Sequence, residues 1–193
     1  MTLCCVALGV WSIAVDPYRQ QAKSLGVVKR LQGHYELVPV QGQAWQRWLV
    51  TTMVGPNSFT EVRSVALDGR NVDGENLAAL AGLIHLQELN LDRTDIKDQD
   101  CSTLRAMRNL RTLSLRFTGV SDRAAEHLAL LPELTTLYLT STEVSDEAVD
   151  ALAKLQSLDE LYIRWTRVSE EGASELRAAM PNCEVYHYAR ADH

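Results

Sequence analysis

An eleven-residue pattern that returns every 24 residues is the feature that most constrains the fold of this chain. Four close copies read LQELNLDRTDI, LRTLSLRFTGV, LTTLYLTSTEV and LDELYIRWTRV, and they begin at Leu86, Leu110, Leu134 and Leu158. A weaker copy begins at Val62, and one period after Leu158 the segment 183–188 keeps only Val185 in register. A single unit cannot bury its own apolar edge. The repeat therefore predicts a stack of about five units that share one continuous core.

The spacing of apolar residues within a unit predicts a strand followed by a helix. Leu110, Leu113 and Leu115 occupy positions 1, 4 and 6 and end in the two-residue alternation of a strand. Later residues of the unit follow a helical spacing that leaves one apolar stripe. The serines at 121, 145 and 169 are expected to be helix N-caps. The acidic residue after each serine places a negative charge at the positive end of the helix dipole.

The pattern LxxLxLxxTxV, which covers about residues 62–183, resembles the leucine-rich repeat family. The resemblance implies an α/β fold: a curved solenoid with a parallel sheet on its concave side and helices on its convex side. That family usually carries Asn or Cys at position 9, whose side chain bonds backbone groups in the turn. Here position 9 is threonine in four units, and a hydroxyl meets only part of that demand. These residues are Thr94, Thr118, Thr142 and Thr166, with Arg70 in the first unit. The T-x-V-S-D version resembles a bacterial subgroup of these repeats.

A stacked array needs a cap at each end. Residues 16–61 are expected to form an α+β N-terminal cap, with a helix over about 16–32, a strand over 35–40 and a helix over 44–54. Trp45 and Trp48 in the second helix are expected to seal the first repeat. At the other end Pro181 stops the last helix, a strand over 183–188 closes the repeat region 62–188, and residues 189–193 form a tail.

The first fifteen residues contain no charged side chain. A membrane anchor is the favoured interpretation, although a helix of this length spans only about 22 Å of a hydrocarbon core of about 30 Å. A signal segment and a buried helix remain as alternatives. The segment together with residues 16–61 resembles the front end of bacterial membrane-anchored leucine-rich repeat proteins. The location is therefore expected to be membrane-associated or cytoplasmic. Its orientation stays open, because the basic residues after the segment favour a cytoplasmic repeat region only if no basic stretch precedes it.

Composition and motifs argue against several functional classes. The net charge of −6 disfavours a nucleic-acid binder. None of the four cysteines forms a CxxC pair, and buried thiols are expected. The histidines do not pair at ligand spacing, and no hydrolase or phosphate-loop motif occurs. We therefore expect no catalytic residue, metal or cofactor.

The side chains between the core leucines predict a binding face. In a strand, residues at positions 3, 5 and 7 point away from the core, and position 8 is expected to join them. Tyr, Trp and Arg are enriched at interface hot spots, and the later units carry them here. The candidate residues are Arg93, Arg116, Phe117, Tyr138, Tyr162, Arg164 and Trp165. Asp68, Glu88 and Asp92 are expected to make the other end of the face acidic. In the alternative reading, Phe117 and Trp165 pack on their neighbours.

The sequence as a whole predicts a non-enzymatic interaction module. It is expected to bind a protein or peptide on the concave face and to be tethered to a membrane through residues 1–15. A soluble adaptor, or a substrate-recognition subunit of a ligase-type complex, is the first alternative. A hydrolase whose site is assembled from distant units is the second.

Overall fold

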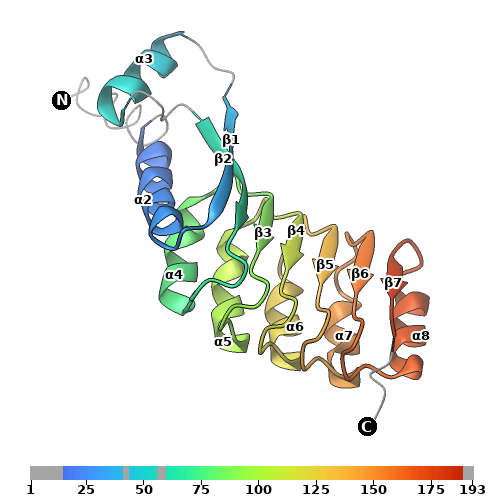
Figure 1. Ribbon diagram of the computed structural model, residues 1–193. Coiled ribbons are helices and arrows are strands. Elements are labelled where there is room, and N and C mark those ends of the chain that lie inside the picture. The colour runs from blue at the N-terminus through green and yellow to red at the C-terminus, as the bar shows by residue number, and fades with distance from the viewer. Residues whose placement is uncertain (1–14, 41–43, 56–59, 189–193) are drawn as a thin grey trace, which may run out of the picture.

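The computed structural model describes residues 15–40, 44–55 and 60–188, except for the side chains of Trp45 and Leu49. Its strands form one seven-stranded sheet whose spatial order is the order of the sequence (Figure 1). β1 pairs antiparallel with β2, and every later pair is parallel. The strands are β1 (His34–Pro39), β2 (Thr60–Ala66), β3 (Glu88–Asn90), β4 (Thr112–Ser114), β5 (Thr136–Tyr138), β6 (Glu160–Tyr162) and β7 (Glu184–Tyr186). The sheet is that of a leucine-rich repeat solenoid, as the sequence predicted.

The register of the parallel strands confirms the 24-residue period. Leu89 lies opposite Leu113, Leu113 opposite Leu137, Leu137 opposite Leu161, and Leu161 opposite Val185. Because each step shifts the pairing by one period, each position of the unit forms a row that crosses the sheet. Residues that are 24 apart in the sequence therefore lie side by side on neighbouring strands.

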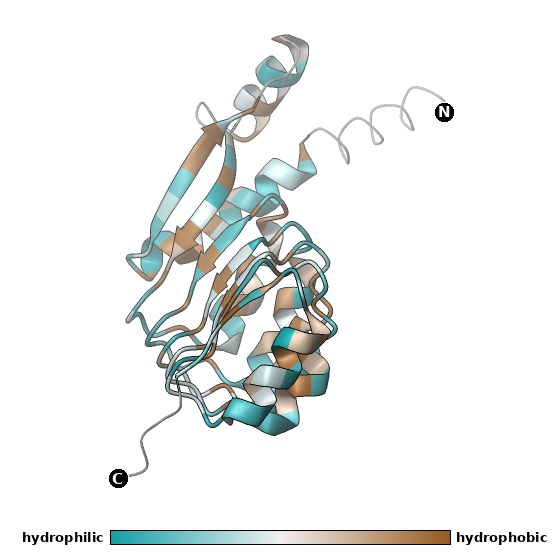
Figure 2. Cartoon of the chain, turned by 90° about the vertical axis from the view of Figure 1, so that its right-hand side faces the viewer, coloured by the Kyte–Doolittle hydropathy of each residue, from teal (hydrophilic) through white to brown (hydrophobic). Residues whose placement is uncertain are grey.

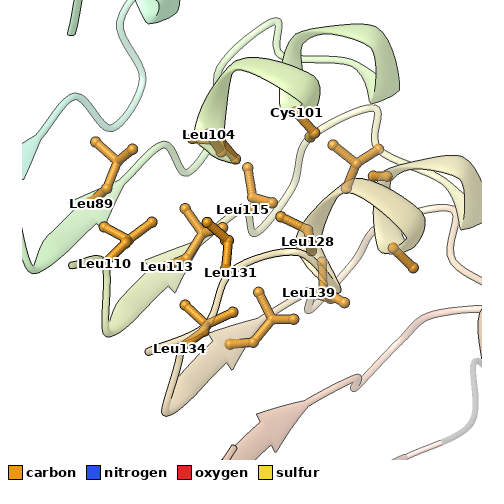
Figure 3. Close-up of a cluster of buried hydrophobic side chains, with 14 of the residues drawn as sticks. Leu89, Cys101, Leu104, Leu110, Leu113, Leu115, Leu128, Leu131, Leu134 and Leu139 are labelled. Atoms are coloured by element: carbon orange, nitrogen blue, oxygen red, sulfur yellow. The ribbon is translucent and has the colours of Figure 1, made fainter. Parts of the chain in front are cut away.

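Helical segments cover one face of the sheet, so that the repeats form two layers (Figures 1 and 2). They are α4 (Gly74–Ala79), η1 (Leu80–Gly82), α5 (Asp98–Cys101), η2 (Ser102–Ala106), α6 (Asp122–Leu128), η3 (Asp146–Ala148), α7 (Val149–Leu152) and α8 (Glu170–Ala179). The leucines of positions 1, 4 and 6 meet the helical residues between the layers; Leu113 and Leu115 are fully buried with Leu128 (Figure 3). Cys101 and Cys183 are buried free thiols as expected, whereas Cys4 and Cys5 lie outside the described residues.

The turn after each strand uses the threonine of position 9. The hydroxyls of Thr94, Thr118, Thr142 and Thr166 each donate a hydrogen bond of 2.6–2.8 Å to the carbonyl three residues earlier. All four side chains are buried. The threonine hydroxyl thus satisfies one backbone carbonyl of the turn in each unit. This is part of what the Asn side chain of other leucine-rich repeats is expected to do, as the sequence predicted.

The helix starts join neighbouring units. The backbone N–H and hydroxyl of Ser145 both donate to the carboxylate of Asp122, at 2.6 and 2.9 Å, and Ser121 bonds Asp98 in the same way. Ser145 and Ser169 also accept the backbone bond of a helix cap. Ser121 is also the N-cap residue of α6, as predicted, but its side chain makes no capping hydrogen bond. Its hydroxyl donates a hydrogen bond to Asp98 of the preceding unit.

The N-terminal end is closed by helix α2 (Asp16–Arg30) and by β1. Val28 enters the repeat core, and the hydroxyl of Ser24 donates to the Ala79 carbonyl at 2.7 Å. The expected seal by tryptophans is wrong for Trp48, which is 64% exposed. The hairpin of β1 and β2 carries α3 (Ala44–Met53) to its far end, away from the repeats (Figure 1). The side chain of Trp45 lies outside the described part of the chain.

Residues 1–14 and 189–193, which hold most of the proposed anchor and the expected tail, lie outside the described residues. Within the described ranges, none of the helices combines the length and the apolar character that a membrane span requires.

Candidate interaction surface

We define the open face as the side of the sheet opposite the helices. Position 5 places three tyrosines in a column on this face, one each on β5, β6 and β7. The rings of Tyr138 and Tyr162 stack with centroids 4.5 Å apart, and those of Tyr162 and Tyr186 with centroids 4.4 Å apart. Stacked rings restrict one another's rotation, so the tyrosine column is already ordered before any partner arrives.

Glutamates at position 3 hold the tyrosine hydroxyls. Tyr162 donates to Glu160 at 3.4 Å, and Tyr186 donates to Glu184. Desolvation, followed by the nearby Glu160 charge, raises the pKa of Tyr162; the hydrogen bond to Glu184 is the main reason why the pKa of Tyr186 is raised. Both phenols therefore remain protonated at neutral pH, and the column presents hydroxyl groups along an acidic edge.

Arginines at position 7 form the opposite edge of the column. The guanidinium carbon of Arg116 lies 4.1 Å from the ring centroid of Tyr138. That of Arg164 lies 5.6 Å from Tyr186 and 5.1 Å from Tyr188. The Nε atoms of both arginines are buried and have no hydrogen-bond partner within the described residues. The tyrosine rings thus position two guanidinium groups through cation–π contacts, which use none of their hydrogen-bond donors.

Position 8 does not continue the strand alternation, which corrects the expectation that it lines the sheet like positions 3, 5 and 7. Arg93, Phe117 and Trp165 have φ values of 55°, 57° and 56°, because the chain turns into the left-handed region there. Their side chains lie at the edge where the strands end, with the Arg93 guanidinium 4.7 Å from the Phe117 ring centroid. Phe117 is 46% exposed and Trp165 is 53% exposed. About half of each ring therefore remains open to solvent.

Tyr186 and Tyr188 belong to this surface but are not among the residues predicted from the sequence. They stand one period after Tyr162 and Arg164, so the repeat itself carried the signal. The signal is hidden because the last unit lacks its leucines. His187 occupies the buried position 6, where its Nε2 lies 2.8 Å from the Val168 carbonyl oxygen and its Nδ1 lies 3.1 Å from Glu170 Oε2.

The acidic end of the face is smaller than expected. Asp92 is buried, where its carboxylate accepts the hydroxyl of Ser114 and, at 2.9 Å, the backbone N–H of Arg116. Asp68 and Glu88 are exposed as predicted. Asp92 therefore supports the position of Arg116 and is not part of an acidic docking surface.

We found no group of three or more His, Cys, Asp or Glu side chains placed to hold a metal ion in the part of the chain that the structure describes. The surface thus consists of rings, hydroxyls, guanidiniums and carboxylates, which suits noncovalent recognition.

Comparison with known proteins agrees with the fold. The sequence matches the family described as Leucine Rich repeat over residues 82–104 and 132–153, and no curated protein matches it. Internalin C2 from Listeria monocytogenes is 32% identical, over 57% of this chain and 46% of its own, with a TM-score of 0.48. The ectodomain of the Arabidopsis thaliana receptor kinase SOBIR1 is 16% identical over 91% of this chain and 94% of its own, with a TM-score of 0.54. The ectodomain of the Arabidopsis receptor kinase HAESA, solved in complex with an IDA peptide hormone, is 17% identical over 90% of this chain and 33% of its own, with a TM-score of 0.52. The chain thus spans less than half of the internalin structure and a third of the HAESA structure.

Proposed function

Because the chain is a leucine-rich repeat protein, we propose that it is a non-enzymatic interaction module that binds a protein or peptide on its open face. The observation that carries this proposal is the tyrosine column with a guanidinium group stacked at each end. Tyr and Arg contribute most to binding when they are desolvated at the centre of an interface. Side chains that are ordered before binding lose less entropy when the partner arrives.

The fold supports a surface of this kind without identifying its ligand. The HAESA ectodomain, a chain of the same fold, was solved in complex with a peptide hormone, which makes a peptide a class of partner to test. Each repeat unit contributes one position-5 and one position-7 side chain to the open face.

Selection from a random-peptide display library on the full chain provides the test. We expect the selected peptides to lose about 2 kcal/mol or more of binding free energy when Tyr162→Ala removes the central ring. Leu130→Ala is the matched control, because Leu130 is 58% exposed and lies beyond α6, outside the open face. Equal affinity for both variants would place the binding site elsewhere.

We further propose that residues 1–15 tether the module to a membrane, because this segment carries no charge. Fractionation of cells that express the full chain, or the chain without residues 1–15, tests the tether. The full chain is expected in the membrane fraction and the shortened one in the soluble fraction. A full chain found entirely in the soluble fraction would exclude the tether without affecting the binding proposal.

A further inference from the structure

The position-7 row carries two arginines that the rest of the described chain leaves without a counter-ion. No carboxylate of the described residues lies within ion-pair distance of the guanidinium group of Arg116 or Arg164. One strand, with Thr140 at the same position, separates them. Asp92 stands one strand before Arg116, but its carboxylate takes the backbone N–H of that residue and the hydroxyl of Ser114.

Each of these arginines is followed by an exposed aromatic residue. Arg116 precedes Phe117 and Arg164 precedes Trp165, whereas the unit between them carries Thr140 and Ser141. The same pair of a cation and a ring therefore occurs twice, on the units of β4 and β6, with one unit between them. The positive φ of these residues recurs at Gly69, Arg93 and Ser141, so it belongs to the turn of each unit. Two half-exposed rings beside two cations without a counter-ion suit a ligand whose groups repeat at the same distance.

The spacing of the two arginines defines that ligand. Neighbouring strands lie about 4.8 Å apart, so the two inter-strand spacings from Arg116 to Arg164 amount to about 10 Å. In a polyproline II chain, residues i and i+3 lie on the same side, about 9 Å apart. In a β-strand, residues i and i+3 point to opposite sides, and residues i and i+2 are only about 7 Å apart.

We propose that the open face binds an acidic peptide in the polyproline II conformation, with carboxylates at i and i+3 that pair with Arg116 and Arg164. This inference rests on the proposed function, for which it names the class of partner. Because the Nε atom of each arginine is buried, the two Nη groups are the donors that remain for a carboxylate, which accepts two parallel hydrogen bonds. Phe117 and Trp165 then contact the apolar part of the peptide on the outer side.

Charges elsewhere on the face keep such a peptide in this row. Glu160 and Glu184 occupy the position-3 edge, across the tyrosine column from the arginines. The exposed Asp68 occupies the position-7 row just after β2, two strands before Arg116. An acidic peptide shifted toward either group meets like charges, which favours a single register.

Synthetic proline-rich peptides with blocked ends test the spacing on the unmodified full chain. One peptide carries glutamates at i and i+3, a second carries them at i and i+2, and a third has glutamines at i and i+3. Isothermal titration is expected to show at least tenfold tighter binding for the first peptide than for the other two, and a decline of that advantage with added salt.

Variants assign the effect to the two arginines. Arg116→Gln and Arg164→Gln are each expected to weaken binding of the i, i+3 peptide about tenfold, because each removes a charge-assisted hydrogen-bond pair. Arg105→Gln, an exposed arginine of the helical side, is the matched control and is expected to leave affinity unchanged. Urea unfolding of each variant establishes that it is folded.

The inference and the proposed function fail in different ways. The inference is wrong if the three peptides bind equally or not at all, or if the arginine variants retain full affinity. If library-selected peptides still depend on Tyr162 but carry no paired acids, the open face remains a binding surface and only the acidic partner is excluded. If the selected peptides are indifferent to Tyr162, both proposals are overturned.

Discussion

Position 8 of the unit shows how the turn after each strand is built. Gly69, Arg93, Phe117, Ser141 and Trp165 all have positive φ between 55° and 63°. Glycine enters this region without cost, whereas a residue with a Cβ pays about 1–2 kcal/mol. The Cβ atoms of Phe117 and Trp165 therefore cost free energy at this position, whatever the size of the rest of the side chain.

Glycine and alanine at position 165 separate the backbone cost from the contacts of the ring. We predict that Trp165→Gly is more stable than Trp165→Ala by about 1 kcal/mol in urea unfolding, because both lose the indole but only alanine keeps the strain. Glu126 in α6 provides the control, since in a helix glycine is about 0.5–1 kcal/mol less stable than alanine. The same order of stabilities at both sites would refute the strain at position 8.

Residue-level prediction from the sequence succeeded where alternation decides the direction of a side chain. Tyr138, Tyr162, Arg116 and Arg164 lie on the predicted face because positions 5 and 7 flank buried position 6. Position 8 was misassigned because its backbone angle depends on the turn, and Gly69 in the first unit was the one hint of it. The stacking of rings and guanidiniums depends on side-chain rotamers, which a linear pattern does not specify.

Among the elements, the helix starts link one unit to the next. The S-D pair predicted a cap within each helix, yet Asp122 accepts two bonds from Ser145 of the following unit. Asp98 and Asp146 take the corresponding places toward Ser121 and Ser169. The sequence could not show this, because the bond joins residues 23 apart whose proximity arises only from stacking. The acidic residue thus stabilises the interface between helices as well as the end of its own helix.

Removing one of these carboxylates should weaken the array. Asp122→Ala is expected to lower the free energy of unfolding by about 1–3 kcal/mol, because it leaves the N–H and hydroxyl of Ser145 without their charged acceptor. Asp150→Ala, at an exposed site of α7, is expected to stay within about 0.5 kcal/mol of wild type. Urea unfolding at neutral pH measures both. Equal stabilities would mean that water replaces Asp122 at no cost.

For the whole molecule, the 24-residue period was sufficient to predict the parallel sheet, the two layers and the position of the core. The period does not predict the structure of residues 16–61, because they lie outside the repeat. There the helix, strand and helix were predicted near their actual bounds, but the role of Trp48 was wrong because the direction of the β1–β2 hairpin is not encoded in a local pattern. The last unit shows the same limit, since Tyr186 was concealed by missing leucines.

The most direct measurement of the central claim is chemical-shift mapping by NMR with the full chain and a library-selected peptide. The account predicts that the shifted backbone amides lie in or just after β4 to β7, around Arg116, Tyr138, Tyr162, Trp165 and Tyr186. Those of α4 to α8 should remain in place. Shifts confined to the helical side, or to the hairpin and α3, would contradict the claim that the open face of the sheet is the binding surface.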